Sequence, residues 1–303
     1  MNPSLRSFIA ICVVVAIGAL VAWAGSDHSL TYQNVSLFWW CALLAFVIQW
    51  LAFIPAYLRQ TEHFYDLVGS CTYLSVVTLA LWLGGKTDER SLVVSVLVAL
   101  WAIRLGSFLF LRISQDGKDS RFDQIKPKPL RFLFAWTLQG LWVFFTLAAV
   151  LVVLTSEYSK PLGAVGYVGI ALWVLGFTLE VVADRQKRVF RAARARGETG
   201  PFITTGLWAH SRHPNYFGEI VLWLGLAVVA APLMNDWQWI GLISPIFVTL
   251  LLTRVSGVPM LEKKSDKQWG DDASYQAYKA RTPVLIPKLL VGSESQAEID
   301  VAK

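Results

Sequence analysis

Side chains that can bind a ligand or move a proton are densest between residues 206 and 219. The run Ser-Arg-His-Pro-Asn at 211–215 stands directly before an apolar segment, and proline favours the first turn of a helix. We therefore expect a helix to begin at Pro214, with Asn215 and Glu219 one turn apart on the same face. A helix start also presents free backbone N–H groups, which suit an anionic ligand. The segment predicts a binding site rather than a solvated loop.

A second polar pair, Glu180 and Asp184, shares one helix face because its members are four residues apart at the end of an apolar run. A basic run that includes Arg188 and Arg191 follows at once. Carboxylates accept hydrogen bonds from ribose or amide groups, and arginines bind phosphates through two N–H donors. The same run is also typical of a basic helix that contacts acidic lipids at a membrane surface. The sequence alone leaves both interpretations open.

Two arginines and two tyrosines complete the candidates. Arg104 lies inside an apolar stretch, where an ionisable group usually serves a function or a partner, although its long side chain could also extend to the interface. Arg254 ends the last apolar stretch. Tyr275 and Tyr278 share a helix face, so they could cover a bound aromatic ring or dock the C-terminal segment on the bundle.

The elements that must position these residues are membrane helices. Only 16% of the residues are charged and 55% are hydrophobic, whereas soluble domains are roughly a quarter charged. A spanning helix needs about 20 mostly apolar residues. Stretches of this kind lie at 8–24, 36–58, 64–83, 91–113, 130–155, 163–183, 218–233 and 237–253. We expect an all-α, polytopic transmembrane bundle of seven to eight helices, because the seventh stretch is short enough to be re-entrant.

Lysine and arginine predict the orientation of this bundle. Of the 27 such residues, only Lys86, Arg90 and Lys160 fall on one side of an eight-span arrangement, and Arg104 falls within a span. The remaining 23 lie on the other side, which the positive-inside rule assigns to the cytosol together with both termini. A bacterial inner membrane and an endoplasmic reticulum both obey this rule. The net charge of +6 therefore reflects membrane topology, and we expect no nucleic acid partner.

The three cysteines, Cys12, Cys41 and Cys71, each lie in an apolar run, and no pair has metal-ligand spacing. They predict small hydrophobic filler, and we expect no metal site. The first apolar stretch resembles a signal peptide, but the charge pattern favours an uncleaved span. No obligate protein partner is indicated.

The motif Ser-Arg-His-Pro-Asn-Tyr-Phe-Gly-Glu at 211–219 resembles that of a membrane family of unassigned function related to steroid 5-alpha-reductase (DUF1295-like). Segments 61–67, 104–106 and 180–184 share this resemblance, which runs from about residue 60 to 287. It divides the chain into N-terminal transmembrane helices at 1–60 and a catalytic transmembrane bundle at 61–290. The low hydrophobicity of 291–303 predicts a disordered tail. The core Arg-His-Pro-x-Tyr is shared more loosely with isoprenylcysteine carboxyl methyltransferases.

The reductase resemblance implies a helical bundle whose cofactor pocket opens to the cytosol and holds NADPH. Arginines would bind the phosphates of this cofactor, and the amide and carboxylate side chains would bind its ribose or carboxamide. The cofactor-binding residues expected from position and chemistry are Arg104, Glu180, Asp184, Arg188, Arg191, Arg212, His213, Asn215, Tyr216, Glu219, Arg254 and Tyr278.

The same resemblance implies hydride transfer to the β-carbon of a conjugated carbonyl, with an acid that polarises the carbonyl oxygen and protonates the enolate. The Gln-Glu dipeptide of steroid reductases is absent near residue 60, and Trp101, an N–H donor, holds the position of their tyrosine. Glu62, Tyr65 and Asp66 are the nearest replacements, with Tyr65 the first choice as proton donor. These departures favour a lipophilic enone or enoyl lipid over a steroid as the substrate.

Three functions fit the sequence. An NADPH-dependent reductase leads, because NADPH carries a 2′-phosphate and a pyrophosphate and five arginines are expected to converge on one cytosolic mouth. A membrane methyltransferase that uses S-adenosylmethionine would explain the Arg-His-Pro-x-Tyr core but not the surplus of arginines, since that cofactor carries no phosphate. A non-catalytic lipid-binding protein is the third, because the expected acid pair is missing. The expected partners are a lipophilic small-molecule substrate and membrane lipid.

Overall fold

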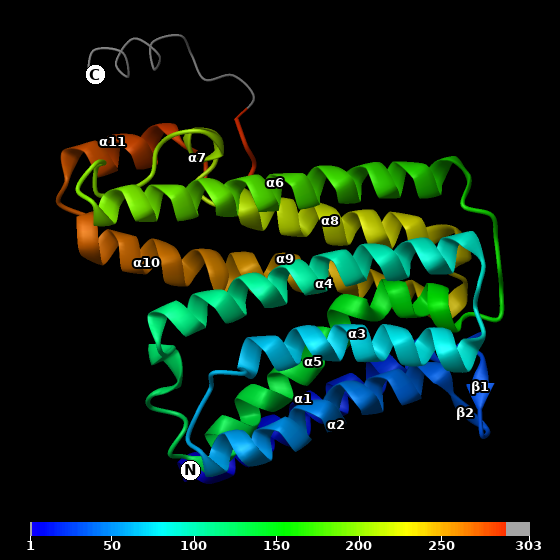
Figure 1. Ribbon diagram of the computed structural model, residues 1–303. Coiled ribbons are helices and arrows are strands. Elements are labelled where there is room, and N and C mark those ends of the chain that lie inside the picture. Colours follow the sequence, from blue (N-terminus) through cyan, green and yellow to red (C-terminus); the bar gives the residue numbers. More distant parts are fainter. Residues whose placement is uncertain (1, 289–303) are drawn as a thin grey trace. The chain divides into compact units, whose positions relative to one another are not determined.

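The computed structural model describes residues 2–288 and consists almost entirely of helices (Figure 1). Eight segments of the described chain are long and apolar enough to cross a membrane, which confirms the all-α prediction with the larger number of spans and indicates an integral membrane protein. The α-helices are α1 Pro3–Gly25, α2 Leu37–Leu58, α3 Tyr65–Gly84, α4 Glu89–Asp116, α5 Pro129–Thr155, α6 Gly163–Ala195, α7 Leu207–His210, α8 Pro214–Ala230, α9 Ile243–Leu250, α10 Gly257–Trp269 and α11 Ala273–Arg281. The short elements are a hairpin of β1 Thr31–Tyr32 and β2 Val35–Ser36, three 3₁₀ turns (η1 Ser120–Phe122, η2 Ala231–Leu233, η3 Asp236–Leu242) and a π-helical turn, η4 Leu251–Val255. The predicted tail at 291–303 lies outside the described residues.

The chain forms two compact units. Unit 1 comprises the chain up to Ile170 together with Leu226–Phe247, and unit 2 comprises Ala171–Gly225 together with the chain from Val248 on. This division follows contacts between residues. The functional division into 1–60, 61–290 and 291–303 stays a prediction.

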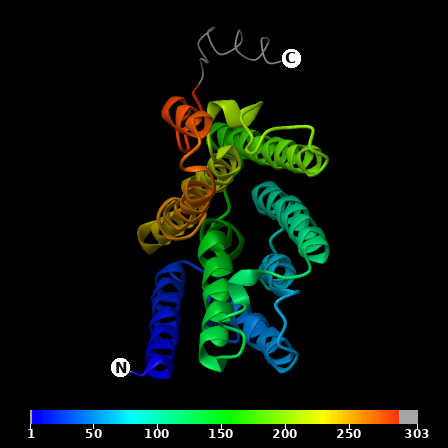
Figure 2. The ribbon, with the colours of Figure 1, turned by 90° about the vertical axis from the view of Figure 1, so that its left-hand side faces the viewer.

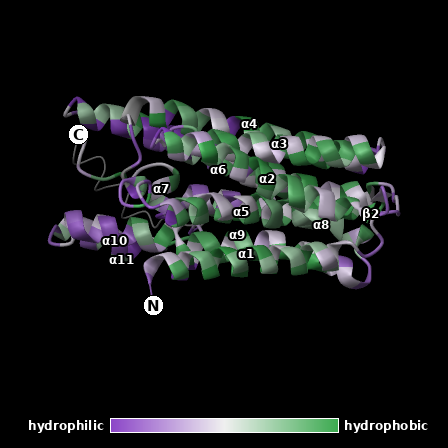
Figure 3. Ribbon diagram, turned by 90° about the horizontal axis from the view of Figure 1, so that it is seen from below, coloured by the Kyte–Doolittle hydropathy of each residue, from purple (hydrophilic) through white to green (hydrophobic). Residues whose placement is uncertain are grey.

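Helix α5 is the core of unit 1. It packs against α1, α2, α3 and α4. In its apolar 18-residue stretch 89% of the residues are buried, compared with 39% or less in the corresponding stretches of those four helices. Figure 2 shows α5 in green between α1 in dark blue and α2 to α4 in lighter blue to cyan. The outer helices keep large apolar side chains exposed, among them Leu20, Leu51 and Trp82. Figure 3 shows this apolar character along their length, in contrast to the polar α10 and α11 of unit 2. The outer surface of unit 1 therefore suits lipid rather than water.

Arg90 closes the end of unit 1 at which α4 begins. The residue is 1% exposed, and its guanidinium donates to the carbonyls of Lys160 (3.3 Å), Pro161 (2.5 Å) and Leu162 (3.0 Å) between α5 and α6. It also donates to the carbonyl of Val229 near the end of α8. The first three carbonyls lie in the connection between two helices and the fourth lies in the last turn of α8, which are places where carbonyls commonly lack a partner within a helix. One side chain thus satisfies backbone groups that burial would otherwise leave unpaired.

In unit 2, α6 and α8 cross with their backbones in contact. A Cβ atom at Gly176 would lie 2.5 Å from the carbonyl oxygen of Gly218 and 2.5 Å from the backbone nitrogen of Leu222. A Cβ atom at Gly218 would lie 2.6 Å from the carbonyl oxygen of Gly176 and 2.8 Å from the backbone nitrogen of Glu180. Small residues permit such close crossings of membrane helices. The crossing holds the turn of α6 that carries Glu180 and Asp184 against the first turns of α8.

Two helix ends differ from the predicted spans. Helix α6 continues beyond the predicted span at 163–183 as far as Ala195, so the basic run is helical. Its basic residues are good helix formers, and the next glycine, Gly197, comes later. The last helical segment, predicted at 237–253, runs from Asp236 to Trp269. Its π-helical turn, after which the Ser256 hydroxyl donates to the Leu251 carbonyl (3.2 Å), lets the chain continue into α10. The predicted start of α8 at Pro214 is confirmed.

Replacing Arg90 with methionine is expected to destabilise the protein by on the order of 3 kcal/mol, because four carbonyls, two of them in buried hydrogen bonds, lose their donor. The measurement is the midpoint of thermal unfolding in detergent micelles. Lys86→Met is the matched control, since the half-buried Lys86 donates to the carbonyl of Tyr158 (2.8 Å) near the same end of the unit. Equal midpoints for the two variants would contradict the role assigned to Arg90.

Gly176→Ala is expected to destabilise unit 2 by about 1–3 kcal/mol, because the added methyl group meets backbone atoms that cannot rotate away. Thermal unfolding and protease resistance of the Ala171–Gly225 segment would measure the loss. Gly200→Ala serves as the control, since a Cβ atom there would meet nothing within 4 Å. A Gly176→Ala protein as stable as the control would show that the helices do not need this contact.

Candidate functional site

The glycine crossing brings together two of the predicted polar residues. The Asn215 carboxamide on α8 donates to Asp184 Oδ1 on α6 at 3.3 Å. Glu180, one turn before Asp184, is 3% exposed, and Glu219, one turn after Asn215, is half-buried. The two pairs that the sequence places at i and i+4 therefore belong to neighbouring helices of one unit. An amide and a carboxylate at this distance can donate to and accept from the same small polar ligand.

Arg212 and His213, immediately before α8, are both held by Glu262 of α10. Arg212 Nη1 donates to Glu262 Oε2 at 2.6 Å, and His213 Nε2 lies 2.9 Å from Glu262 Oε1. The His213 ring stacks on Tyr216 with their centroids 5.6 Å apart and their planes 8° from parallel. Glu262 was not among the predicted site residues. Its one signal in the sequence is its place within the segment that shares the family resemblance.

Residues Thr282–Lys288, which we call the C-terminal strap, hold the loop that carries Arg212. The backbone nitrogen of Arg212 donates to the carbonyl of Pro283 (2.9 Å), and that of Lys288 donates to the carbonyl of His210 (2.9 Å). The Ser211 hydroxyl donates to the carbonyl of Leu285 (2.8 Å). The strap thus pairs with the loop much as a strand pairs with its neighbour, and it fixes where α8 begins.

Helix α11 docks through the two tyrosines whose role the sequence left open. The Tyr278 hydroxyl donates to the carbonyl of Trp208 (2.7 Å), and the Tyr275 hydroxyl donates to Asp266 (3.0 Å). Burial raises the pKa of Tyr278, so its hydroxyl keeps its proton and remains a donor. Phe202 lies between these rings, 5.3 Å from Tyr275 and 5.9 Å from Tyr278 between centroids. The tyrosines therefore dock the C-terminal segment, and both also line the hollow described next. Figure 1 shows α7 and α11 beside the C-terminal half of α6.

A hollow of about 270 Å³, which we call the basic hollow, opens among α6, α7, α10 and α11 of unit 2. Its walls carry cations from two helices and the Arg212 loop, and aromatic rings from four helices and the loop before α7. The cations are Lys187, Arg191, Arg194, Arg212 and Lys264, and the rings are Phe190, Phe202, Trp208, Trp269, Tyr275 and Tyr278. Positive charge beside flat apolar rings suits a ligand that carries both a phosphate and an aromatic ring.

Four predicted cofactor residues line the basic hollow, namely Arg191, Arg212, His213 and Tyr278. Arg188 and Arg254, from the same unit, are exposed and lie outside its lining. Arg104 belongs to unit 1, where its guanidinium lies 5.6 Å from the centroid of the Phe108 ring. Within unit 2, two of the predicted arginines therefore share one hollow.

The predicted acids lie in unit 1, where each has a defined partner. The Tyr65 hydroxyl donates to the carbonyl of Ala135 (2.8 Å) within an aromatic cluster with Phe122 and Trp136. Glu62 accepts from Lys126 Nζ (2.5 Å) and from the backbone nitrogen of Asp119 (2.8 Å). Asp66 lies 3.7 Å from Arg112 in a half-exposed ion pair. Their catalytic roles stay predictions.

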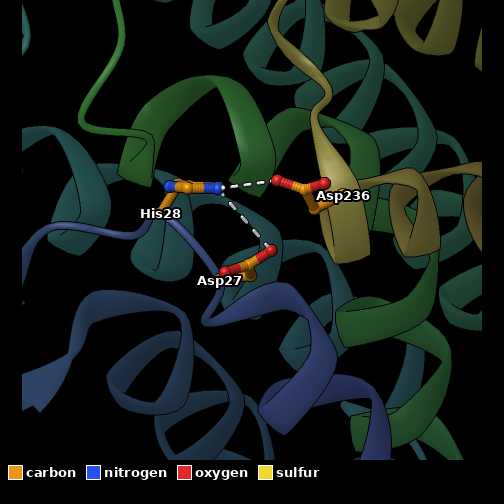
Figure 4. A group of neighbouring side chains, drawn as sticks. All are labelled: Asp27, His28 and Asp236. Atoms are coloured by element: carbon orange, nitrogen blue, oxygen red, sulfur yellow. Dashed lines mark hydrogen bonds and ion pairs between the residues drawn. The ribbon is translucent and has the colours of Figure 1, made fainter.

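One group in the described chain has a geometry that could hold a metal ion: Asp27, His28 and Asp236, all in unit 1 (Figure 4). His28 Nε2 lies 3.1 Å from Asp236 and 3.8 Å from Asp27. The hydrogen bond with Asp236 raises the pKa of His28, and the Tyr158 hydroxyl lies 3.2 Å from its other nitrogen. An ion pair between a histidine and two aspartates accounts for this arrangement without an ion.

The Glu62–Lys126 pair anchors the segment between α4 and α5, and it predicts a pH dependence of stability. Burial alone raises the pKa of Glu62, but the Lys126 ammonium and the Asp119 N–H outweigh it and hold the pKa below its ordinary value near 4.5. The pairing therefore stabilises the fold above about pH 4.5, and this contribution is lost as the pH falls through the lowered pKa.

Thermal midpoints measured from about pH 6 down to about pH 3 should fall for the native protein and fall less steeply for Glu62→Gln. Glu198→Gln is the control, because Glu198 pairs with Arg196 on the surface, where an ion pair contributes little. Parallel curves for the native protein and Glu62→Gln would disprove the anchoring role.

Comparison with known proteins agrees with the resemblance seen in the motifs. An uncharacterized protein of Schizosaccharomyces pombe is 25% identical over 187 residues, which cover 52% of this chain and 54% of that protein. The 3-oxo-5-alpha-steroid 4-dehydrogenase 1 of Rattus norvegicus is 32% identical over 124 residues, or 40% of this chain and 41% of the enzyme. The Mus musculus enzyme of the same name is 31% identical over a similar share, 40% and 42%. The chain thus matches about half or less of the length of these relatives.

No solved structure matches the chain. The family model described as "Protein of unknown function (DUF1295)" matches residues 52–282, which is most of the sequence and includes both the Arg212 loop and Glu262. The predicted resemblance is therefore confirmed, with distant similarity to 3-oxo-5-alpha-steroid 4-dehydrogenase 1. The protein belongs to the DUF1295 family.

Proposed function

We propose that this protein is a membrane-embedded reductase that uses NADPH to reduce a lipophilic α,β-unsaturated substrate. Its distant similarity to enzymes named 3-oxo-5-alpha-steroid 4-dehydrogenase supports oxidoreductase chemistry on a carbon–carbon bond. The observation that carries the proposal is the basic hollow, in which five cations and several aromatic rings surround one space. A phosphorylated nucleotide presents the complementary chemistry, and a sterol or fatty acyl chain does not.

Two residues that line the hollow each carry a buried side-chain nitrogen without a partner among the described residues, which supports the fit of such a cofactor. Arg212 Nε and His213 Nδ1 are buried and have no hydrogen-bond partner within residues 2–288. A buried polar atom without a partner costs roughly 1–3 kcal/mol, so a ligand that pairs with both atoms gains that free energy on binding. Arginine and histidine are suited to the oxygens of a phosphate.

Each wall of the site has a proposed role. Arg191 and Arg212 hold phosphate oxygens, and Tyr278 with Trp208 packs against an aromatic ring. The Asp184–Asn215 pair, which lies outside the lining of the hollow, binds ribose or carboxamide groups, since it offers both an acceptor and a donor. The bound cofactor supplies the hydride for reduction of the double bond.

The proton donor is proposed from Glu62, Tyr65 and Asp66 of unit 1. Tyr65, the first choice from the sequence, already donates its one hydroxyl proton to a carbonyl, and Glu62 accepts two hydrogen bonds that favour its charged form. Asp66 has the loosest partner of the three, at 3.7 Å. We therefore rank Asp66 first as the proton donor. Comparing the turnover of Asp66→Asn with that of Tyr65→Phe tests this order.

The proposal also places the basic hollow and both termini on the cytosolic side. The lysines and arginines that the sequence assigns to one side include every cation lining the hollow. Cytosolic NADPH would then reach the hollow directly, while a lipophilic substrate could enter from the bilayer.

Arg191→Ala is expected to weaken NADPH binding by roughly 10- to 100-fold, because a charged hydrogen bond to phosphate contributes roughly 1.5–3 kcal/mol. Binding to the purified protein in detergent is the measurement. Arg188→Ala is the matched control, since Arg188 carries the same charge less than one turn away on α6 but lies outside the hollow.

The same titration with NADH and S-adenosylmethionine tests the cofactor itself. Stabilisation by NADPH with loss in Arg191→Ala supports the reductase. Stabilisation by S-adenosylmethionine alone would instead favour the methyltransferase, and equal losses in the two arginine variants would mean that the hollow is not the cofactor site.

A further inference from the structure

The basic run at the end of α6 is divided between two faces of the helix. One face lines the basic hollow and carries Lys187, Phe190, Arg191 and Arg194. With about 100° between successive residues, Arg185 lies opposite the middle of that face, and Arg188 lies beside Arg185 on the next turn. Both of these arginines are exposed and lie outside the lining of the hollow. The structure thus leaves two arginines of this run on a face that the proposed cofactor site does not use.

The charge of these two arginines is not neutralised by the described part of the protein. Within residues 2–288, neither Arg185 nor Arg188 has a hydrogen bond or an ion pair. By contrast, Arg196 at the end of the same helix pairs with Glu198 at 2.6 Å. The nearest carboxylate along the helix, Asp184, accepts a hydrogen bond from α8. An anion that binds Arg185 and Arg188 therefore displaces no partner.

The place of the two arginines along α6 puts them at the level of lipid headgroups. The apolar stretch of the helix ends at residue 183. At about 1.5 Å per residue, Arg185 and Arg188 lie roughly 3 and 8 Å beyond that end. The polar layer of one leaflet is roughly 5–8 Å thick. Both guanidiniums are therefore within reach of lipid phosphates, whereas Arg194 lies roughly 17 Å beyond the stretch.

The same face also carries exposed apolar side chains. Val182 is 37% exposed and Val189 is 60% exposed, and they lie three residues before and four residues after Arg185. A helix face that mixes valine with arginine suits the boundary between acyl chains and headgroups. The guanidinium of arginine can bind a phosphate through two N–H donors. The sequence left a nucleotide site and a lipid contact open for this run, and the two faces of the helix allow both.

We propose that Arg185 and Arg188 form a binding surface for the phosphate of an anionic phospholipid in the leaflet at this end of α6. The occupant is a lipid rather than a nucleotide, because the surface continues an apolar span and lies outside the hollow. Two cations beside one phosphate favour a headgroup with net negative charge over a zwitterionic one. This inference is independent of the proposed function, since it uses no residue of the hollow.

The test is native mass spectrometry of the full chain, released from detergent after titration with dioleoyl phosphatidylglycerol or dioleoyl phosphatidylcholine. Both lipids carry a phosphate and the same acyl chains, but only phosphatidylglycerol has a net charge. The native protein should retain phosphatidylglycerol more tightly. Arg185→Gln/Arg188→Gln should weaken the tightest binding of phosphatidylglycerol by roughly tenfold and leave phosphatidylcholine unchanged, because each cation near the surface attracts an anionic lipid.

Two matched double variants separate position and charge from folding. Arg191→Gln/Arg194→Gln removes the same two charges from the hollow face of the same helix, and it should keep the binding of phosphatidylglycerol. Arg185→Lys/Arg188→Lys keeps both charges and should recover most of the affinity, which would not happen if the glutamine variant had lost its fold.

Equal affinity for phosphatidylglycerol in the native protein and Arg185→Gln/Arg188→Gln would overturn the inference, as would equal affinity of the native protein for the two lipids. A loss in Arg191→Gln/Arg194→Gln alone would overturn it as well, because the lipid phosphate would then lie in the basic hollow.

NADPH binding by the same proteins keeps this inference apart from the reductase proposal. Arg185→Gln/Arg188→Gln should bind NADPH as the native protein does, since neither residue lines the hollow. A native protein that binds phosphatidylglycerol through Arg185 and Arg188 but does not bind NADPH would support the inference and overturn only the cofactor assignment.

Discussion

A chain in a bilayer must form hydrogen bonds to its own backbone N–H and carbonyl groups, because the hydrocarbon contains no water that could bond to them. Arg90 shows how this protein meets that requirement where helices end: one guanidinium serves carbonyls from the α5–α6 connection and from α8. The π-helical turn at Leu251–Val255 meets it in another way, since the chain changes its hydrogen-bond register without leaving the helix. Both devices keep the connections short, and short connections hold the helices in fixed register.

Within unit 2 the candidate site depends on the close packing of α6 against α8. The Gly176–Gly218 crossing brings two backbones into contact, which places Asp184 beside Asn215 and sets the direction in which α8 starts. The Arg212 loop then emerges at a fixed point, where Glu262 and the C-terminal strap hold it. A polar site in a mostly apolar protein therefore depends on two residues that have no side chain.

The spans could be predicted because hydrophobicity is a property of a segment and needs no knowledge of its neighbours. The start of α8 at Pro214 followed from local backbone preference in the same way. The span predicted at 163–183 does not give the end of α6, because a count of apolar residues does not detect a helix that continues through arginine and lysine. Arg90 was predicted only as a loop charge, since nothing local reveals which distant carbonyls it serves.

The site was less predictable because it depends on the rotation of each helix about its axis. Arg188 and Arg191 are alike in sequence, yet Arg191 lines the basic hollow and Arg188 does not. Glu262 was not predicted as a site residue, because its contacts lie some fifty residues earlier in the chain. Tyr65 had the right chemistry for an acid, but its hydroxyl proton goes to the Ala135 carbonyl of another helix.

The C-terminal strap has a consequence for the order in which this protein matures. Residues Thr282–Lys288 are among the last of the described chain to be synthesised, and they bond directly to the loop that carries Arg212. While a ribosome is still making the chain, all eight spans can enter the membrane before this segment has emerged. The spans are then in place while the Arg212 loop still lacks its hydrogen bonds to the strap. The loop that carries Arg212 therefore gains its last backbone hydrogen bonds only when the chain has been made as far as Lys288.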